Sequence, residues 1–118
     1  MNSLTFNEYT KHAESTAADF EHTEQPWYVA LGLCGESGEV ADALKKIYRE
    51  FGSVENAPAQ RKQHVLRELG DVLWYLNRMA TVLGSSLDEV AQLNIDKLSK
   101  RKKTGSIIDM TKRSQKDV

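Results

Sequence analysis

The sequence is short of cysteine, proline and long apolar runs, and these shortages exclude several classes of protein. Its one cysteine, Cys34, rules out an internal disulfide and fits a reducing compartment. No apolar stretch approaches the roughly 18 residues that a membrane span needs. The N-terminal segment contains no basic region followed by an apolar stretch, which a secretory signal would show. We therefore expect a soluble, cytoplasmic protein that has no membrane partner.

The sequence also has little net charge, and it lacks long runs of alternating β-branched residues. The formal net charge of the 118 residues is −1, which gives nucleic-acid binding no general support, although basic residues gather between Lys97 and Lys116. At 40% hydrophobic residues, the chain can bury only a modest core. We expect a single domain over residues 1–103, completed by association with further copies, and a flexible basic tail over residues 104–118.

The remaining pattern is helical. Without long alternating runs there is no signal for strands, and the predicted fold class is all-α, a bundle of four to five helices. Apolar residues recur at spacings of three and four, which is typical of amphipathic helices. The predicted helices cover about residues 3–20, 26–51, 58–83 and 86–102.

Proline, glycine and polar residues mark the ends of these helices. Proline is favoured in a first helical turn and glycine just after a last one. Asn56 is a candidate cap for the third helix, and the sequence SLDE at residues 86–89 has the form of a capping box for the fourth. The proline and glycine signals are, in chain order, Pro26, Gly52, Pro58 and Gly84.

One pentapeptide pattern occurs twice, as ESGEV at residues 36–40 and ELGDV at residues 68–72. Each residue turns a helix by about 100°, so acids three residues apart lie about 60° from one another on one face. The apolar stripe of each predicted helix falls on that same face. Four acids are thus predicted to lie in the apolar seam between two antiparallel helices: Glu36, Glu39, Glu68 and Asp71.

Four carboxylates in such a seam indicate a divalent metal ion. Buried carboxylates are costly unless they are paired or bound to a metal, and carboxylates that share a site raise one another's pKa. No histidine follows an acid at i+3, as helical di-iron sites require. Oxygen ligands favour magnesium, manganese or calcium, and magnesium commonly shares its ligands with substrate phosphates. The alternative interpretation is that these acids lie on solvated helix faces, where acidic pairs are common.

The predicted last helix carries candidate phosphate-binding residues. Asn94 and Arg101 share the apolar stripe of this helix, and Lys97 lies slightly outside it. An arginine can hold phosphate oxygens bidentately, and a lysine can add a point charge. Basic residues in a last helical turn also complement the helix dipole, which is the alternative explanation for Lys97 and Arg101 but does not account for Asn94.

Aromatic residues near both acid motifs are candidates for stacking on a nucleobase. Trp27 and Tyr28 open the second predicted helix, and Trp74 and Tyr75 follow the second acid motif. Of the latter two, Tyr75 shares the face of the acids and Trp74 does not. For any single ring, packing in the core is the alternative.

Three stretches together resemble a known superfamily. GLCGESGEVADALKKI, LRELGDVLWYLNRMA and NIDKLSKRK are similar to the MazG-like, all-α nucleoside triphosphate pyrophosphohydrolases, over about residues 26–103. The resemblance implies a helical bundle that assembles as a homodimer or homotetramer. It implies hydrolysis of a nucleoside triphosphate to the monophosphate and pyrophosphate.

The resemblance also implies roles for individual residues. The paired acids Glu36, Glu39, Glu68 and Asp71 would bind magnesium, for which manganese can substitute. Lys97 and Arg101 would contact phosphates, and Tyr75 would lie near the substrate. Some members carry a further glutamate just before the first motif acid; glycine occupies that position here, which leaves the number of metal ions open.

The resulting hypothesis is metal-assisted hydrolysis at the α-phosphorus, in which Glu36 or Glu39 orients or deprotonates the attacking water. The nearest alternative is the same chemistry on phosphoribosyl-ATP, whose hydrolase belongs to this superfamily. A nonenzymatic helical metal-binding adaptor is an alternative of another class. A nucleic-acid binder that uses the basic tail is a third, and it predicts salt-sensitive binding that survives loss of the acids.

Overall fold

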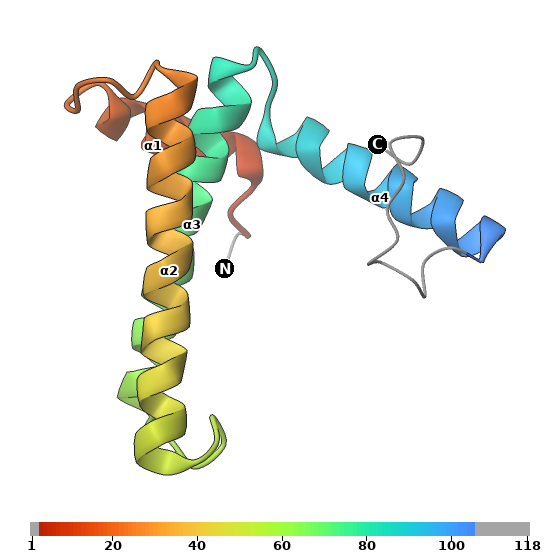
Figure 1. The fold of residues 1–118 in the computed structure, drawn as a ribbon. Helices are drawn as coiled ribbons and strands as arrows, with labels where there is room; N and C mark the ends of the chain where they lie inside the picture. Colours follow the sequence, from red (N-terminus) through yellow and green to blue (C-terminus); the bar gives the residue numbers. More distant parts are fainter. Residues whose placement is uncertain (1–2, 106–118) are drawn as a thin grey trace.

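The computed structural model describes residues 3–105, which form four α-helices joined by short connections (Figure 1). This range contains no β-strand, so the predicted all-α class is confirmed, and it contains no fifth helix. Within it no helix is both long enough and apolar enough to cross a membrane. Most of the predicted tail, residues 106–118, lies outside the described residues. The helices are α1 (Phe6–Ala17), α2 (Pro26–Phe51), α3 (Ala59–Val82) and α4 (Leu87–Thr104).

Most helix ends fall where proline, glycine and serine predict them. Pro26 is the first residue of α2, and Gly52 ends this helix in a left-handed conformation with φ 77°. Gly84, with the same φ, follows α3. The backbone N–H of Glu89 donates to the Ser86 hydroxyl at 3.2 Å, which satisfies one free donor at the start of α4.

Three end predictions are wrong. Helix α1 ends at Ala17 rather than near residue 20. Helix α1 begins at Phe6 rather than near residue 3, because Thr5 and Glu8 form a reciprocal capping box. Asn56 does not cap α3, whose N-cap residue Pro58 makes no side-chain capping bond. The Asn56 amide instead donates to the carbonyl of Phe51 at 3.4 Å, so it satisfies the end of α2.

Helices α2 and α3 form a long antiparallel hairpin, the central feature of the fold (Figure 1). Val29 and Ile47 of α2 are almost fully buried, and each burial stabilises the fold by about 1.5–3 kcal/mol. Gly32 faces the ring of Tyr75 on α3 so closely that a β-carbon at this position would overlap the ring. The absence of a side chain at Gly32 therefore lets Tyr75 lie against the α2 backbone, at the level of the first acid motif.

Helix α1 packs on the open end of the hairpin, where α2 begins and α3 ends, and polar contacts fix it to α3 (Figure 1). The Thr10 hydroxyl donates to the fully buried Asn77 at 2.7 Å, and the Trp74 indole donates to the Thr16 hydroxyl at 2.9 Å. Helix α4 leaves the same end and extends away from the hairpin, contacting α1 and α3 (Figure 1). The connection between α1 and α2 covers residues 18–25, and two of its residues, Phe20 and Thr23, line the pocket described below.

Much apolar surface stays uncovered in the single chain. Buried apolar residues are few and mostly small, whereas several large side chains of α2, α3 and α4 are more than one-third exposed. The largest exposed fractions among them belong to Tyr48, Leu31, Trp27, Leu93, Leu66 and Ile95, and Leu83, which follows α3, is also exposed. A chain that leaves this much apolar area in water is suited to association.

Candidate active site

Three of the four predicted ligands lie together where α2 faces α3. Glu36, Glu68 and Asp71 can each place one carboxylate oxygen so that all three oxygens lie within 4.8 Å of one another. We call these residues the acid group. Opposite ligands of an octahedral magnesium ion are about 4.2 Å apart, so small side-chain rotations would bring these oxygens to coordination distance. Glu36 and Glu68 are half-buried, and Asp71 is exposed at the edge of the group.

The electrostatics of the acid group favour a bound cation. Burial raises the pKa of the Glu36 carboxyl above its usual value of 4.5, and the negative charges of Asp71, Glu68 and Glu39 raise this pKa further. Burial and repulsion by the neighbouring acids therefore act together to raise the pKa of Glu36. A divalent cation between the three carboxylates would replace this repulsion with attraction and keep them ionised.

Glu39 lies outside the acid group. Its side chain is exposed, and its oxygens are not among those that converge with the other three, although its charge reaches Glu36. The expectation that all four acids are buried in the seam is therefore wrong for Glu39 and Asp71, which are both exposed. Whether Glu39 is a ligand or a catalytic residue stays a prediction.

Two neighbouring charged groups have other partners. Asp42, one turn after Glu39, pairs with Lys46 at 2.8 Å and Lys45 at 3.2 Å, and these hydrogen bonds lower its pKa. His64, one turn before Glu68, places its Nε2 atom 3.5 Å from a Glu68 oxygen and is half-exposed. Asp42 is therefore engaged on the surface of α2, and His64 lies beside the Glu68 carboxylate.

A pocket of about 240 Å³ adjoins the acid group and shares Asp71 with it. Its rings pack edge to face: the Phe20 and Trp74 centroids are 6.1 Å apart, and those of Trp74 and Tyr75 are 5.0 Å apart. Offset and edge-to-face arrangements are the favourable ones for aromatic pairs. We call this the aromatic pocket; it is lined by Phe20, Thr23, Tyr28, Asp71, Trp74 and Tyr75.

Two tyrosine hydroxyls lie within the field of the acids. Burial raises the pKa of Tyr75, with smaller contributions from Tyr28, Glu36 and Asp71. Burial and the Asp71 charge raise the pKa of Tyr9 on α1 in the same way. Both hydroxyls therefore stay protonated at neutral pH and are available as hydrogen-bond donors beside the carboxylates.

Sequence reasoning placed Tyr75 at the site but missed three contributors. Tyr9, Phe20 and Thr23 come from α1 and from the connection that follows it, and their positions depend on tertiary packing. Tyr9 and Phe20 share the apolar stripe of the first predicted helix, residues 3–20, which predicts burial against a neighbour but not which neighbour. Thr23 carried no signal in the sequence.

The remaining predicted substrate-binding residues do not join this pocket within one chain. Trp27 is 61% exposed and contacts Tyr28, with ring centroids 6.0 Å apart. Asn94 and Lys97 line a separate pocket of about 260 Å³, with Val90 and Leu93 of the same helix. Arg101 is only 5% exposed, so the open surface of α4 does not present it. Their roles in binding stay predictions.

Comparisons with known proteins agree with this geometry. The family model described as the MazG nucleotide pyrophosphohydrolase domain matches residues 25–106. The chain is 40% identical over 91 residues to the Gene 37 protein of Mycobacterium phage L5, covering 77% of this chain and 78% of that protein. It is 33% identical over 85 residues to the uncharacterized protein YvdC of Bacillus subtilis (strain 168), covering 67% and 78% respectively. No solved structure matches the chain.

The matched range includes both acid motifs, three acids of which converge between α2 and α3, together with most of the residues that line the aromatic pocket. It spans well over half of the sequence. The chain therefore belongs to the MazG nucleotide pyrophosphohydrolase family, an all-α family.

Proposed function

We propose that this protein is a magnesium-dependent pyrophosphohydrolase that converts a nucleoside or deoxynucleoside triphosphate to the monophosphate and pyrophosphate. The observation that carries the proposal is the position of Asp71, which belongs both to the acid group and to the aromatic pocket. Metal-ligating oxygens thus adjoin a space walled by rings, as a molecule with a polyphosphate at one end and a base at the other requires.

Magnesium fits the donor set best, and manganese is the expected substitute. All three converging ligands are carboxylates, and hard divalent cations prefer oxygen. Three carboxylates do not fill an octahedral shell, which leaves positions for phosphate oxygens and water. When bound, such an ion polarises phosphate oxygens and lowers the pKa of water.

Glu36 is the better placed of the two candidate bases. It belongs to the acid group beside which a metal-bound water would lie, whereas Glu39 lies outside that group. The water oxygen forms a bond to the α-phosphorus as the bond to the oxygen bridging to the β-phosphorus breaks. Pyrophosphate leaves with that oxygen, and the carboxylate accepts the water proton. Glu39 is the alternative base, acting from the exposed edge of α2.

The aromatic pocket is the proposed site of the nucleobase. Stacking of a base on an aromatic ring contributes about 1–3 kcal/mol, and it tolerates different bases because every base has a π-face. Tyr75 is held against α2 by its contact with Gly32, so its ring is a fixed platform. Trp27, which lies outside this pocket, is proposed as a peripheral contact of the same substrate.

We further propose that the working form is a homodimer or homotetramer. The large apolar side chains left exposed on α2, α3 and α4 support this, as does the separation within one chain of Asn94 and Lys97 from the acid group. When a second copy covers these faces, Asn94, Lys97 and Arg101 on α4 of that copy would approach the substrate phosphates bound at the acid group of the first copy. Light scattering coupled to gel filtration measures the assembly, and a monomer at micromolar concentration would contradict this part of the proposal.

The decisive experiment is a substrate panel. Ribonucleoside and deoxynucleoside triphosphates and phosphoribosyl-ATP are incubated with the protein, with magnesium or with EDTA, and monophosphate and pyrophosphate are quantified. We expect magnesium-dependent release of both products from at least one nucleoside triphosphate. Preference for phosphoribosyl-ATP would replace the proposed substrate class while keeping the chemistry.

The matched variants are Glu36→Gln, Asp71→Asn and Asp42→Asn. The first two remove ligands of the acid group with little change in volume, and activity should be lost. Asp42→Asn makes the same acid-to-amide change about one turn beyond Glu39, where the carboxylate pairs with lysines, and it should leave activity near normal. Absence of pyrophosphate release from every substrate, with manganese binding intact, would indicate the nonenzymatic metal-binding adaptor instead.

A further inference from the structure

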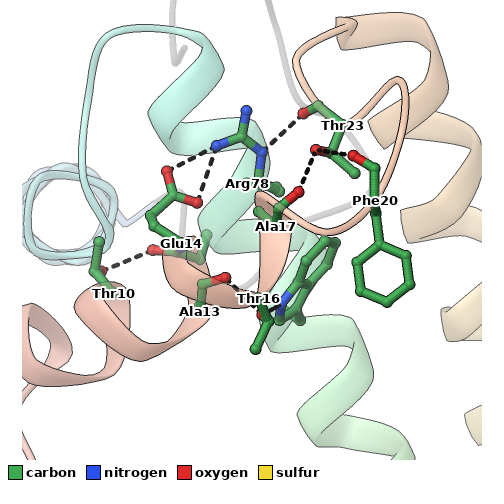
Figure 2. A network of polar contacts seen from close by, with 10 residues as sticks. Thr10, Ala13, Glu14, Thr16, Ala17, Phe20, Thr23 and Arg78 are labelled. Atoms are coloured by element: carbon green, nitrogen blue, oxygen red, sulfur yellow. Dashed lines mark hydrogen bonds and ion pairs between the residues drawn. The ribbon is translucent and has the colours of Figure 1, made fainter.

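The connection between α1 and α2 is anchored by a single guanidinium from α3 (Figure 2). The Nε atom of Arg78 donates to the Thr23 carbonyl at 2.8 Å. Its Nη1 atom donates to both carboxylate oxygens of Glu14 on α1, at 2.7 and 2.9 Å. The Arg78 and Glu14 side chains are only 13% and 27% exposed. Arg78 therefore ties together three segments of the chain in a site that is largely shielded from water.

The anchored segment is also one wall of the aromatic pocket. Phe20 and Thr23 line this pocket on one side. On the other side they line a second cavity of about 270 Å³, which Glu14 and Arg78 also line. Phe20 and Thr23 thus form a wall between the aromatic pocket and the second cavity, which we call the partition. Arg78 contacts the partition from the side of the second cavity.

The other hydrogen bonds of this segment are local. The N–H groups of Phe20 and Gln25 donate to the carbonyls of Ala17 and His22 at 3.1 and 3.0 Å, and Thr23 is only 4% exposed. The Thr23 hydroxyl lies 3.3 Å from the Ala17 carbonyl and 3.4 Å from the Phe20 carbonyl, both long for a hydroxyl donor. His22 adopts a left-handed conformation with φ 69°, which a residue with a β-carbon disfavours. Phe20 is 62% exposed and meets the pocket mainly through the edge of Trp74. The hydrogen bonds within the segment give it its local shape, and the bond from Arg78 to the Thr23 carbonyl ties its backbone to α3.

We propose that Arg78 is a positioning residue for substrate recognition, which holds Phe20 and Thr23 at the distance from Trp74 and Tyr75 that a nucleobase requires. The identity of the ligand as a nucleobase rests on the proposed function; the anchoring itself does not. Arginine is needed because its planar fork reaches a carboxylate and a carbonyl together, whereas the single ammonium of lysine cannot reproduce this geometry. Arg78 acts on the base end of the substrate and leaves the acid group unchanged.

The test compares Arg78→Lys with Arg61→Lys. Arg61 lies on the same helix and also pairs with a glutamate of another helix, Glu50, but it lies near the opposite end of the hairpin. We expect Arg78→Lys to raise KM for the preferred nucleoside triphosphate about tenfold, equivalent to about 1.4 kcal/mol, with kcat within about twofold. Arg61→Lys should leave both constants unchanged.

A base-free inhibitor separates positioning of the base from general damage. Inorganic tripolyphosphate with magnesium occupies the phosphate and metal side without a base. Its inhibition constant should be the same in the wild type and in Arg78→Lys. A parallel rise in KM and in this inhibition constant, or a loss of kcat at unchanged KM, would overturn the proposal.

Two readouts need no turnover. Hydrogen exchange of the amides in residues 19–25 should be faster in Arg78→Lys and unchanged in Arg61→Lys. Calorimetric titration with nucleoside monophosphates, without metal, should show about tenfold weaker binding by Arg78→Lys. If the wild type releases no pyrophosphate, the proposed function fails, and these two readouts still decide the anchoring. Unchanged exchange overturns the anchoring, and a wild type that binds no nucleoside monophosphate overturns the role of Arg78 in base recognition.

A second variant guards against a fold defect. Glu14→Gln keeps the Arg78 bond to Thr23 and removes only the ionic partner, so it should shift KM and exchange in the same direction by a smaller factor. Circular dichroism establishes that each variant is folded. If Arg78→Lys unfolds, Glu14→Gln carries the test, and no change in its KM and exchange rejects the proposal.

Discussion

Glu36 and Glu39 on α2 have the same spacing as Glu68 and Asp71 on α3, yet the two pairs have different surroundings. Both acids of α3 enter the acid group, whereas α2 contributes Glu36 and leaves Glu39 outside it. Helix α3 packs against α1, α2 and α4, and α2 packs mainly against α3. The α3 motif therefore has neighbours on α1 as well as on α2, as the effect of Asp71 on the pKa of Tyr9 indicates, whereas its near-copy on α2 faces mainly α3.

The difference extends to what each pair touches. Asp71 is flanked by rings of the aromatic pocket, and its charge influences the pKa of Tyr9 and of Tyr75. Within residues 3–105 Glu39 has no comparable neighbour, and the next acid along α2, Asp42, pairs with lysines. Equal sequence spacing thus gives unequal roles, because each role depends on which helices lie opposite.

The largest effect should come from removing Asp71. We expect Asp71→Asn to lower kcat at least about 100-fold, the size found when a group that stabilises the transition state is removed. Glu39→Gln should cost about tenfold or less, as for a charge that acts through the general field. Steady-state kinetics with saturating magnesium measures both. An equal loss in both variants would identify Glu39 as the base and remove the asymmetry between the motifs.

A substitution at Gly32 should disturb the contact between the two acid-bearing helices. Gly32→Ala places a β-carbon into the ring of Tyr75, and overpacking of this kind costs about 1–3 kcal/mol. Urea unfolding measures this loss, and Tyr75→Ala in the same background should relieve it. A Gly32→Ala variant with unchanged stability would show that Tyr75 is not fixed against α2.

Acid should weaken metal binding through Glu36. Because its pKa is raised above 4.5, Glu36 takes up a proton at a higher pH than an ordinary glutamate, and manganese affinity should fall through that raised pKa as pH falls. In the metal-free protein, folding stability depends on pH in the opposite direction from metal affinity: the contribution of Glu36 to stability falls as pH rises. The folded state then binds more protons than the unfolded state between 4.5 and the raised pKa, so the contribution to stability is complete below 4.5 and lost as pH rises through the raised pKa.

Asp71→Asn sharpens this pH test. Removing the Asp71 charge, the largest of the like charges acting on Glu36, should move the loss of metal affinity to lower pH. Manganese titrations between pH 4 and 8, followed by electron paramagnetic resonance, compare the two proteins. A transition at the same pH in both would contradict the electrostatic origin of the shift.

The smallest expected effects concern the glycines at the centre of the two motifs. A β-carbon at Gly38 or Gly70 would meet no atom within 4 Å in the single chain. Alanine should therefore stabilise each helix by about 0.5–1 kcal/mol. Thermal melts together with light scattering check this. A destabilised Gly70→Ala or Gly38→Ala variant that also loses its oligomeric state would show that a second copy covers that motif.

The sequence is sufficient for the helices and for the shared face of the acids, because both depend on local geometry. Proline and glycine predict the ends of α2 and α3 to within about a residue, and i, i+3 spacing brings Glu68 and Asp71 to one side. The error at the start of α1 had a local signal too, since Thr5 and Glu8 have capping-box spacing. The identification of the family likewise came from contiguous motifs.

The aromatic pocket and its anchor could not be predicted in this way. Thr23 and Arg78 are 55 residues apart and Glu14 and Arg78 are 64 apart, so their contacts depend on how α1 docks. Helical periodicity also cannot decide which of two acids on a stripe is turned toward the neighbouring helix, which is why Glu39 was placed with the others. Such features follow from packing between helices.

The partition formed by Phe20 and Thr23 has a consequence for how such proteins diversify. These residues belong to a short connection between helices, where substitutions and insertions are tolerated, and they do not belong to the acid group. Under the proposed function, mutations in this connection would alter which nucleotide the protein accepts and would preserve the hydrolytic step. Selectivity could then drift between related chains along a few loop positions, with the carboxylates inherited unchanged.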